Sequence, residues 1–317
     1  MNILIASSID PDAIAALEAE HDVVCAFGAP EATLHSRIAD REALIFRSGV
    51  QITSAVMDNA PHLRLIVRAG SGYENIDIDY VRRRRIRFIR IPGPGAQAVA
   101  EMSFCLMLAL ARRLRWADGE WRRGKWVKSA ANGHLLSGKT LGIVGAGNIG
   151  SRTGKLGAAW GMKVIGCVEH PTAEQRARLR NDGIELAGLA EVLAASDFVS
   201  VHVPLQASTR NLISAGALAL MKPGAILVNL SRGGVVDERA LYEALGSGRL
   251  ACAGLDVHEN EGDGHVSPLA ALDNVLLTPH IGASTVDSQR EIGRIILSAV
   301  EEAVARPVME NEPVAVY

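Results

Sequence analysis

Short apolar runs alternate along the chain with segments whose apolar residues recur at helical spacing. In the first third, five runs predict β-strands, at residues 2–7, 22–27, 43–48, 63–69 and 87–92. Pro11–Glu20 has helical spacing, with Asp10 as the expected N-cap and proline at the first helical position. This alternation predicts a parallel sheet with helices on both faces.

A second series of strands follows a break in the pattern. Pro92-Gly93-Pro94-Gly95 interrupts all periodicity and predicts a hinge or linker. A long apolar helix is expected at 97–116, buried in a core or in a subunit interface. Six further runs predict strands at 141–145, 163–168, 198–203, 225–230, 251–257 and 274–279. They predict one complete doubly wound nucleotide-binding domain, after which 284–305 returns to helix.

Length and charge limit the possible partners. The 317 residues give room for two ordinary domains, and the net charge of −2 lacks the basic excess of a nucleic-acid-binding domain. Arg82 to Arg85 are interpreted as a solvated helix end rather than a basic patch. The chain starts directly with a strand, and the apolar helix around 99–111 is judged too short to span a bilayer. We therefore expect a cytoplasmic protein without nucleic-acid or membrane partners.

The cysteine and tryptophan spacings predict structural roles. The four cysteines show neither CxxC spacing nor pairing with His at metal-ligand spacing, so buried reduced thiols and no metal site are expected; they are Cys25, Cys105, Cys167 and Cys252. Trp116, Trp121 and Trp126 recur every five residues, which fits neither a helix face nor a strand. They are expected to pack under a loop, with contact to a cofactor as the less favoured alternative.

A glycine-rich turn predicts dinucleotide binding. Gly145-x-Gly147-x-x-Gly150 follows one predicted strand and opens a helix-compatible segment, and a second strand comes after it. Gly145 would form the tight turn, Gly147 would let the backbone approach a pyrophosphate, and Gly150 would let the helix pack closely on the strand. The N–H groups at the helix N-terminus would then face the phosphates.

Reactive side chains follow three of the predicted strands, at the edge of the sheet where such domains bind ligands. Arg232 follows the fourth strand of the second series, Glu259 and Glu261 follow the fifth, and His280 follows the sixth. Arg binds a carboxylate through two hydrogen bonds, His transfers protons near neutral pH, and a neighbouring carboxylate fixes the His tautomer. Singly, Arg232 could be a surface residue, Glu261 a solvated one and His280 a strand-end hydrogen-bonding group. Jointly they predict a catalytic site.

Five motifs resemble the D-isomer-specific 2-hydroxyacid dehydrogenase family, and most of all its 3-phosphoglycerate dehydrogenase branch. They are Asn229-Leu-Ser-Arg-Gly-Gly-Val-Val-Asp-Glu238, Ala253-Gly-Leu-Asp-Val257, Thr278-Pro-His-Ile-Gly-Ala-Ser-Thr285, Val67-Arg-Ala-Gly-Ser-Gly-Tyr-Glu-Asn-Ile-Asp77 and Ser200-Val-His-Val-Pro-Leu205. The resemblance implies an α/β fold of two doubly wound parallel-sheet domains with a cleft between them. Residues 1–95 and 284–317 would form a flavodoxin-like substrate domain, and 96–283 a Rossmann NAD-binding domain.

The resemblance also implies roles for individual residues. Arg232 would bind the substrate carboxylate and carbonyl, and Glu261, five residues beyond Asp256, would be the partner of the general acid/base His280. Backbone groups of Ser71 and Gly72 would hold the substrate carboxylate, and Asp256 the nicotinamide carboxamide. The remaining cofactor contacts would come from Ser71, Gly145, Gly147, Asn148, Ile149, Gly150, Glu169, Val203, Leu230, Ser231 and Gly282.

The chain departs from the family pattern in three places. His258 replaces an aromatic residue, and Asn260 and Gly262 replace prolines, so the loop around Glu261 is expected to be more mobile. At the ribose position, Val168 stands where the family has Asp, with Glu169 next. The loop Arg47-Ser48-Gly49-Val50-Gln51 lacks a hydroxyl and a positive charge of the family pattern.

The sequence thus predicts an oxidoreductase that acts on a small 2-hydroxy or 2-keto acid. NAD is preferred because Glu169 would repel a 2′-phosphate, although NADP is not excluded. Arg47 is expected to face the far end of the substrate, and the helix 97–116 to form a homodimer contact. Two alternatives stay open: an NADPH-dependent glyoxylate or hydroxypyruvate reductase, and a nucleotide-sensing protein of the corepressor type.

Overall fold

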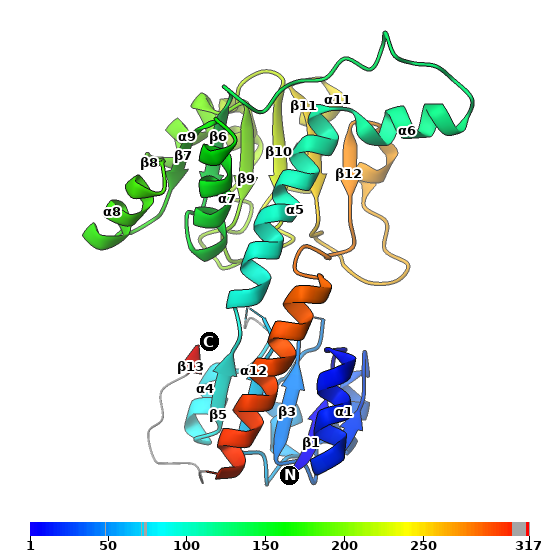
Figure 1. The fold of residues 1–317 in the computed structure, drawn as a ribbon, viewed down its shortest axis with the longest axis vertical. Helices are drawn as coiled ribbons and strands as arrows, with labels where there is room; N and C mark the ends of the chain where they lie inside the picture. The colour runs from blue at the N-terminus through cyan, green and yellow to red at the C-terminus, as the bar shows by residue number, and fades with distance from the viewer. Residues whose placement is uncertain (48, 71, 73–74, 306–314, 317) are drawn as a thin grey trace. The chain divides into compact units, whose positions relative to one another are not determined.

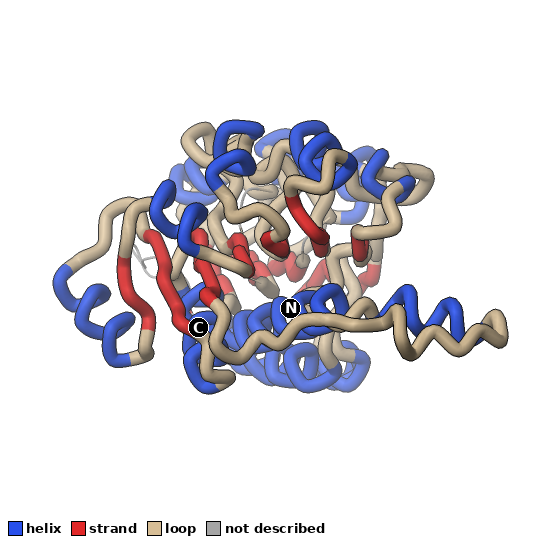
Figure 2. Tube along the Cα trace, turned by 90° about the horizontal axis from the view of Figure 1, so that it is seen from above, coloured by secondary structure: helices blue, strands red, loops and turns tan. Residues whose placement is uncertain are grey.

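The computed structural model describes residues 1–47, 49–70, 72, 75–305 and 315–316. The chain divides into two compact units, which are described separately. Unit 1 comprises Met1–Ala96 and Ser284–Tyr317, and unit 2 comprises Gln97–Ala283. Each unit is a parallel sheet flanked by helices (Figures 1 and 2). The predicted α/β class with parallel sheets is therefore confirmed.

Unit 1 contains a six-stranded parallel sheet in the order β13-β5-β4-β3-β1-β2. Its strands are β1 (Asn2–Ile5), β2 (Asp22–Cys25), β3 (Ala43–Phe46), β4 (Leu65–Arg68), β5 (Arg87–Arg90) and β13 (Ala315–Val316). Its helices are α1 (Pro11–Glu20), α2 (Glu31–Arg37), α3 (Ser54–Asp58), α4 (Ile78–Arg83) and α12 (Val286–Ala305). The Asp10 side chain caps α1 by accepting the Ala13 N–H, as predicted.

Apolar side chains fill both faces of the unit 1 sheet, which explains why its inner strands β1, β3 and β4 are nearly continuous apolar runs. Leu44, Ile66 and Phe88 belong to one buried cluster. Their neighbours Ile45, Val67 and Ile89 belong to another, which α12 completes with residues such as Ile296. α12 lies alongside α1 on this face (Figure 1).

Unit 2 contains a seven-stranded parallel sheet in the order β12-β11-β10-β9-β6-β7-β8. Its strands are β6 (Thr140–Val144), β7 (Lys163–Cys167), β8 (Ile184–Leu186), β9 (Phe198–Val201), β10 (Ala225–Asn229), β11 (Leu250–Leu255) and β12 (Val275–Leu277). Its helices are α6 (Leu114–Arg122), α7 (Asn148–Ala159), α8 (Ala173–Asn181), α9 (Leu189–Ala195), α10 (Ala215–Leu220) and α11 (Glu238–Gly246), with the 3₁₀-helix η1 (Pro268–Ala271).

The sequence prediction missed one strand in each unit. The six strands predicted for unit 2 did not include β8, and the five predicted for unit 1 did not include β13. Both are short strands at the edge of a sheet. An edge strand of two or three residues carries too little apolar alternation to be recognised against its surroundings.

The long apolar helix begins earlier and ends earlier than predicted. α5 (Gly93–Ala111) takes in three residues of the expected linker, so the linker prediction was wrong. Pro94 is tolerated because the first turn of a helix has no partner for its N–H groups. Leu106 and Leu110 of α5 pack beside Gly254 of β11.

α5 also corrects the judgement on membrane spanning. With 19 residues it is long and apolar enough to cross a membrane by length and composition alone. However, 56% of its most apolar window is buried, as in the core helix of a soluble protein.

The predicted helix 97–116 is in fact two helices. Arg113 has a positive φ of 53°, and this left-handed conformation ends the helical path between α5 and α6. The expectation that the tryptophans pack under a loop was wrong. Trp121 and Trp126 form an edge-to-face pair and are 61% and 73% exposed, while the Arg113 guanidinium covers the Trp116 ring.

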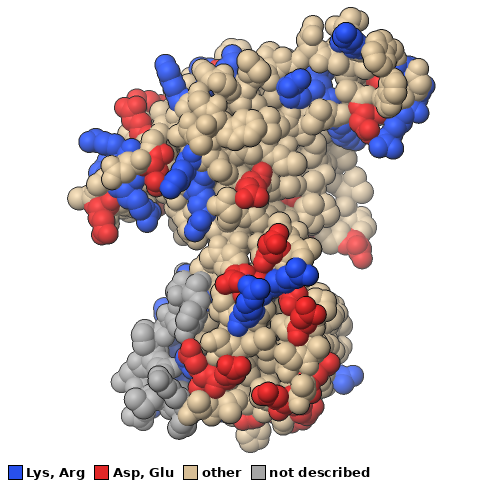
Figure 3. All heavy atoms as spheres, viewed as in Figure 1, with Lys and Arg blue, Asp and Glu red and all other residues tan. Residues whose placement is uncertain are grey.

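The cysteines are free thiols, as expected, but their predicted burial was wrong. Cys25 and Cys105 are exposed, and Cys167 and Cys252 are half-buried. In strands and helices with one face on the core, an apolar neighbourhood in sequence does not fix which face a given residue occupies. On the face seen in Figure 3, acidic and basic side chains are interspersed.

Candidate active site

The glycine-rich turn between β6 and α7 has the geometry that dinucleotide binding requires. Gly145 has a φ of 93°, and a Cβ there would lie 2.7 Å from Cγ1 of Val203. A Cβ on Gly150 would lie 2.2 Å from the carbonyl oxygen of Gly145, so the helix packs directly on the turn. A Cβ on Gly147 would meet no atom within 4 Å. The backbone is therefore open at the one glycine where a pyrophosphate would approach, and the residues present fit a dinucleotide.

The other predicted cofactor residues lie around this turn and at the neighbouring strand ends. Asn148 and Ile149 are the first two residues of α7. Glu169 is exposed, two residues beyond β7, whose last carbonyl (Cys167) accepts the N–H groups of Gly145 and Ala146. Val203 packs against Gly145, and Leu230 and Ser231 follow β10. Their contacts with a cofactor stay predictions.

Asn229 shapes the turn that carries Arg232, a role that sequence reasoning missed. Its Oδ1 accepts the N–H of Ser231 at 3.0 Å and the Ser231 hydroxyl at 2.7 Å. Its Nδ2 donates to the carbonyl of Arg232 at 3.2 Å. A Cβ on Gly233 would lie 1.7 Å from the carbonyl oxygen of His258, so only glycine permits this close approach of the two loops.

Arg232 is half-buried at the end of β10. Its Nη1 donates to the carbonyl of Ser231 at 2.7 Å. This hydrogen bond holds one end of the Arg232 guanidinium against the backbone of the turn that carries it. A guanidinium can bind a planar carboxylate through two parallel hydrogen bonds, and the role predicted for Arg232 stays a prediction.

Asp256 holds the loop that carries His280. Only 1% of Asp256 is exposed, and its Oδ1 accepts the Thr278 hydroxyl at 2.6 Å and the Ile281 N–H at 2.8 Å. Its Oδ2 accepts the Gly282 N–H at 2.7 Å. The predicted contact with a nicotinamide carboxamide stays a prediction, whereas these three bonds give the carboxylate a definite structural role.

The side chains of His280 and Glu261 are hydrogen-bonded to each other. Nδ1 of His280 lies 2.9 Å from Oε2 of Glu261. His280 has a positive φ of 55°, unusual for a residue with a side chain, and its N–H donates to the carbonyl of Asp256 at 2.8 Å. Strained backbone of this kind persists where the surrounding structure fixes it, and it clusters at functional sites.

The charge of Glu261 is stabilised by its two histidine neighbours. Burial alone would raise the pKa of Glu261, but the hydrogen bond and charge of His280, with the N–H and charge of His258, hold it below its usual value. The His258 N–H donates to Oε1 at 3.2 Å. Glu261 is therefore ionised near neutral pH, as a partner of a proton-transferring His should be.

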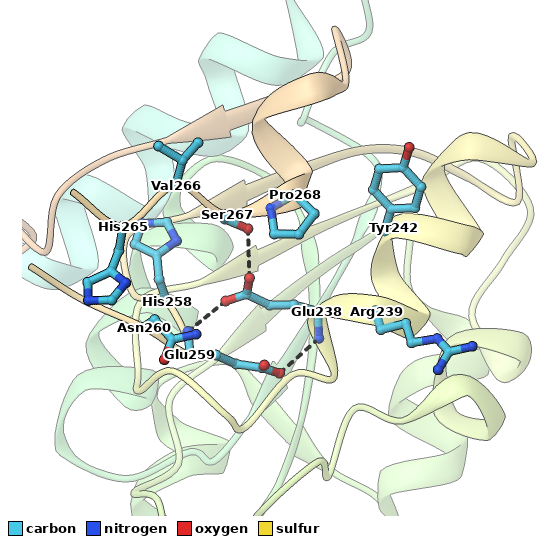
Figure 4. A pocket seen from close by; sticks show the side chains of 10 residues that line it. All are labelled: Glu238, Arg239, Tyr242, His258, Glu259, Asn260, His265, Val266, Ser267 and Pro268. Carbon is cyan, nitrogen blue, oxygen red and sulfur yellow. Dashed lines mark hydrogen bonds between the residues drawn. The ribbon is translucent and has the colours of Figure 1, made fainter.

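The loop around Glu261 has fixed points although it lacks the expected prolines. His258, which stands in place of an aromatic residue, has its Nε2 2.9 Å from the carbonyl of Thr278. Glu259 and Ser267 are both bonded to the Glu238 side chain (Figure 4). Sequence reasoning missed Glu238 because it lies in the helix that follows the Arg232 turn.

The predicted substrate residues of unit 1 are only partly described. Arg47 follows β3 and is half-buried, and burial lowers the pKa of its guanidinium. Among the residues that the structure describes, Arg47 forms no ion pair, while its carbonyl accepts Nδ2 of Asn75 at 3.3 Å. Gly72 is half-buried. The predictions for Ser71 and for the Ser48 position lie outside the described residues.

The described part of the chain contains no group of three or more His, Cys, Asp or Glu side chains that could hold a metal ion.

Comparisons with known proteins identify the family to which the chain belongs. Residues 104–282 match the family described as "D-isomer specific 2-hydroxyacid dehydrogenase, NAD binding domain". The chain is 38% identical over 312 residues to the D-3-phosphoglycerate dehydrogenase of Methanocaldococcus jannaschii, covering 98% of this chain but only 59% of that relative's length.

Two other relatives are matched over most of their length. The hydroxypyruvate reductase of Thermotoga maritima is 42% identical over 259 residues, which are 81% of this chain and 82% of that protein. The structure of a D-lactate dehydrogenase from Aquifex aeolicus, complexed with NAD and lactic acid, superposes with a TM-score of 0.84 at 30% identity, covering 96% of both chains. The resemblance predicted from the five motifs is thus confirmed. The chain belongs to the D-isomer-specific 2-hydroxyacid dehydrogenases.

Proposed function

We propose that this protein catalyses oxidation and reduction at C2 of a small D-2-hydroxy acid and the corresponding 2-keto acid, in the manner of 3-phosphoglycerate dehydrogenase. The observation that carries the proposal is the 2.9 Å contact between His280 and Glu261. It lies at the carboxyl ends of β11 and β12, beside the strand whose end carries Arg232. Ligands of doubly wound sheets bind at this edge.

The residues would divide the chemistry among them. A bound nicotinamide dinucleotide supplies or accepts the hydride at C2. His280 removes the hydroxyl proton in oxidation and returns a proton to the carbonyl oxygen in reduction. Glu261 stabilises the imidazolium form, and Arg232 binds the substrate carboxylate and polarises the carbonyl. Backbone groups of Ser71 and Gly72 would complete the carboxylate site.

We propose NAD as the cofactor. The turn at Gly145, Gly147 and Gly150 would hold the pyrophosphate, and the Glu169 carboxylate would accept hydrogen bonds from the ribose hydroxyls. The remaining contacts are those named above from the resemblance, namely Asn148, Ile149, Val203, Leu230, Ser231, Asp256 and Gly282. The match of 104–282 to the NAD-binding domain of the family supports this assignment, with unit 1 as the substrate domain.

The substrate proposal depends on Arg47. A half-buried guanidinium without an ion pair among the described residues suits a second anionic group of the substrate. Gln51 lacks the positive charge expected of the phosphoglycerate branch, so we propose a small polar 2-hydroxy acid with a distal anion, 3-phosphoglycerate being the first to test. Arg47→Ala should lower kcat/KM for a substrate with the distal anion more than for one without it. An equal loss for both would contradict this role.

We also propose a cytoplasmic homodimer with α5 in the subunit contact. This helix is more apolar than a surface helix requires, and 56% of its most apolar window is buried within one chain. Light scattering at micromolar concentration should give twice the 33.7 kDa of one chain. A mass near that of a single chain would contradict the dimer.

Steady-state kinetics with a panel of 2-keto acids tests the main proposal. Reduction with NADH, dependent on His280, is the expected result. Strong preference for glyoxylate or hydroxypyruvate with NADPH would favour the reductase alternative; the Thermotoga maritima relative is named a hydroxypyruvate reductase. Nucleotide binding without turnover on any 2-keto acid would favour a sensor protein.

A further inference from the structure

Two glutamates bind each other's backbone beside the candidate active site. Oε1 of Glu238, the first residue of α11, accepts the N–H of Glu259 at 2.7 Å. In return, Oε1 of Glu259 accepts the N–H of Glu238 at 3.3 Å. The other oxygen of Glu238 accepts the Ser267 hydroxyl at 2.7 Å (Figure 4). Although it is an acidic residue, Glu238 is only 9% exposed.

These bonds fix both sides of the segment that carries Glu261. Glu259 lies two residues before it and Ser267 six residues after it, and the residues between them are largely exposed and outside helices and strands. Asn260 and Gly262 provide none of the rigidity of proline. Both side-chain oxygens of Glu238 are therefore used to fix this loop to α11.

The start of α11 is a favourable place for these two acidic side chains. The first N–H groups of a helix have no intrahelical partner, and the helix dipole favours negative charge there. The carboxylate of Glu259 satisfies one of these N–H groups, while Asp237 caps another by accepting the N–H of Ala240 at 2.9 Å.

A ligand site is the alternative for this cluster. An open pocket of about 420 Å³ is lined by Glu238, Tyr242, His258 and Ser267 among others. However, the oxygens of Glu238 point toward the loop and are occupied by its donors (Figure 4). The contacts therefore favour a structural link between helix and loop.

We propose that Glu238 is a positioning residue for the reaction: it holds the loop from His258 to Ser267 so that Glu261 stays within hydrogen-bond distance of His280. This inference rests on the proposed function of the His280–Glu261 pair. Glu238 would act through Glu261 and would touch neither substrate nor cofactor.

The test compares three variants of the full chain. Glu238→Ala should lower kcat by about 10-fold or more, since a misplaced catalytic group costs one to two orders of magnitude. It should leave the KM for the cofactor unchanged. Glu238→Gln should recover most of the activity, because its carbonyl can accept the Glu259 N–H and its amide can donate to Ser267. Glu243→Ala, at an exposed position of the same helix, is the matched control and should match the wild type.

Proton NMR of the protein without substrate gives a readout independent of activity. The Nδ1 proton of His280 bonded to Glu261 should give a downfield resonance in the wild type and in Glu238→Gln, and lose it in Glu238→Ala. Wild-type kcat together with an intact resonance in Glu238→Ala would overturn the proposal. Should that variant fail to fold, Glu238→Asp keeps the charge but shortens the reach, and an unchanged kcat and resonance there would overturn it equally.

Failure of the proposed function is distinguishable from failure of this inference. If the wild type turns over no 2-keto acid, the proposed reaction is wrong. The resonance of His280 still shows whether Glu238 holds the pair together.

Discussion

Nδ1 of His280 lies 2.9 Å from Oε2 of Glu261. Because an ionised carboxylate only accepts hydrogen bonds, Nδ1 carries a proton and Nε2 is the nitrogen that can exchange one with a ligand. The pair therefore fixes both the tautomer and the direction of the ring.

Replacing His280 should remove proton transfer but leave cofactor binding intact. We expect His280→Ala to lower kcat by about 10²–10⁴-fold, the usual contribution of general acid–base catalysis. Steady-state rates between pH 5 and 9, with fluorescence titration of NADH, would measure both quantities. Near-wild-type kcat across this range would show that His280 is not the acid/base.

Asp256→Ala should destabilise unit 2 and disorder the loop of His280. The change leaves the Thr278 hydroxyl and the N–H groups of Ile281 and Gly282 without their acceptor. Each buried unsatisfied donor costs about 1–3 kcal/mol, and partial relaxation should leave a net loss of roughly 2–4 kcal/mol. Urea unfolding would measure it, with Asp263→Ala as the exposed control. A loss no greater than in the control would contradict the role of Asp256.

Much of the fold could be predicted from the sequence because buried parallel strands are apolar on both faces. β3, for example, is fully buried and entirely apolar, and β4 is fully buried and apolar except for Arg68. The start of α5 could not be predicted, because proline and glycine indicate a break in isolation but are tolerated in the first helical turn. The exposure of Trp121 and Trp126 depends on tertiary packing that no local pattern encodes.

The candidate site also has parts that the sequence predicted and parts that it could not. The family resemblance implied that Glu261, five residues beyond Asp256, is the partner of His280, and the two side chains lie 2.9 Å apart. Their catalytic roles stay predictions. The contribution of Glu238 could not be predicted, because its partners Glu259 and Ser267 lie 21 and 29 residues away. From the sequence alone, a carboxylate in the first turn of a helix indicates only a favourable interaction with the helix dipole.

Two glycines of the turn, Gly145 and Gly147, should respond differently to alanine. Gly145→Ala would place a Cβ 2.7 Å from Val203 at a φ of 93°, so we expect a loss of about 1–3 kcal/mol of stability and of dinucleotide binding. Gly147→Ala meets no protein atom within 4 Å, so its stability should match the wild type. It should still bind NADH more weakly, because the methyl group occupies the space of the pyrophosphate. Unchanged affinity in Gly147→Ala would place the pyrophosphate elsewhere.

His202 should make the protein less stable in acid. Burial lowers its pKa from 6.5 to about 3, its Nε2 contacts the Ser200 hydroxyl at 2.8 Å, and its buried Nδ1 has no partner among the described residues. Between these two pKa values the unfolded chain binds a proton that the folded protein does not, so the free energy of unfolding falls as pH drops below about 6.5.

The slope of this fall can reach about 1.4 kcal/mol per pH unit for one group. His202→Gln should flatten the dependence between pH 7 and 4 in urea unfolding, whereas His134→Gln at an exposed site should not. An equally steep dependence in both variants would show that other groups cause the acid sensitivity.

Glu169 should decide the choice between NAD and NADP. It is exposed two residues beyond β7, and the carbonyl of Cys167 on this strand accepts the N–H groups of the glycine turn. A carboxylate at the end of this strand can accept hydrogen bonds from the ribose hydroxyls and would repel a 2′-phosphate. We expect the wild type to prefer NADH in kcat/KM, and Glu169→Gln to gain on NADPH by roughly 10-fold, since loss of one repulsive charge contact is worth about 1–2 kcal/mol. Glu174→Gln, on the following helix, is the matched control. If Glu169→Gln changed the two coenzymes equally, Glu169 would be a solvated surface residue, and Val168 would leave the ribose site without discrimination.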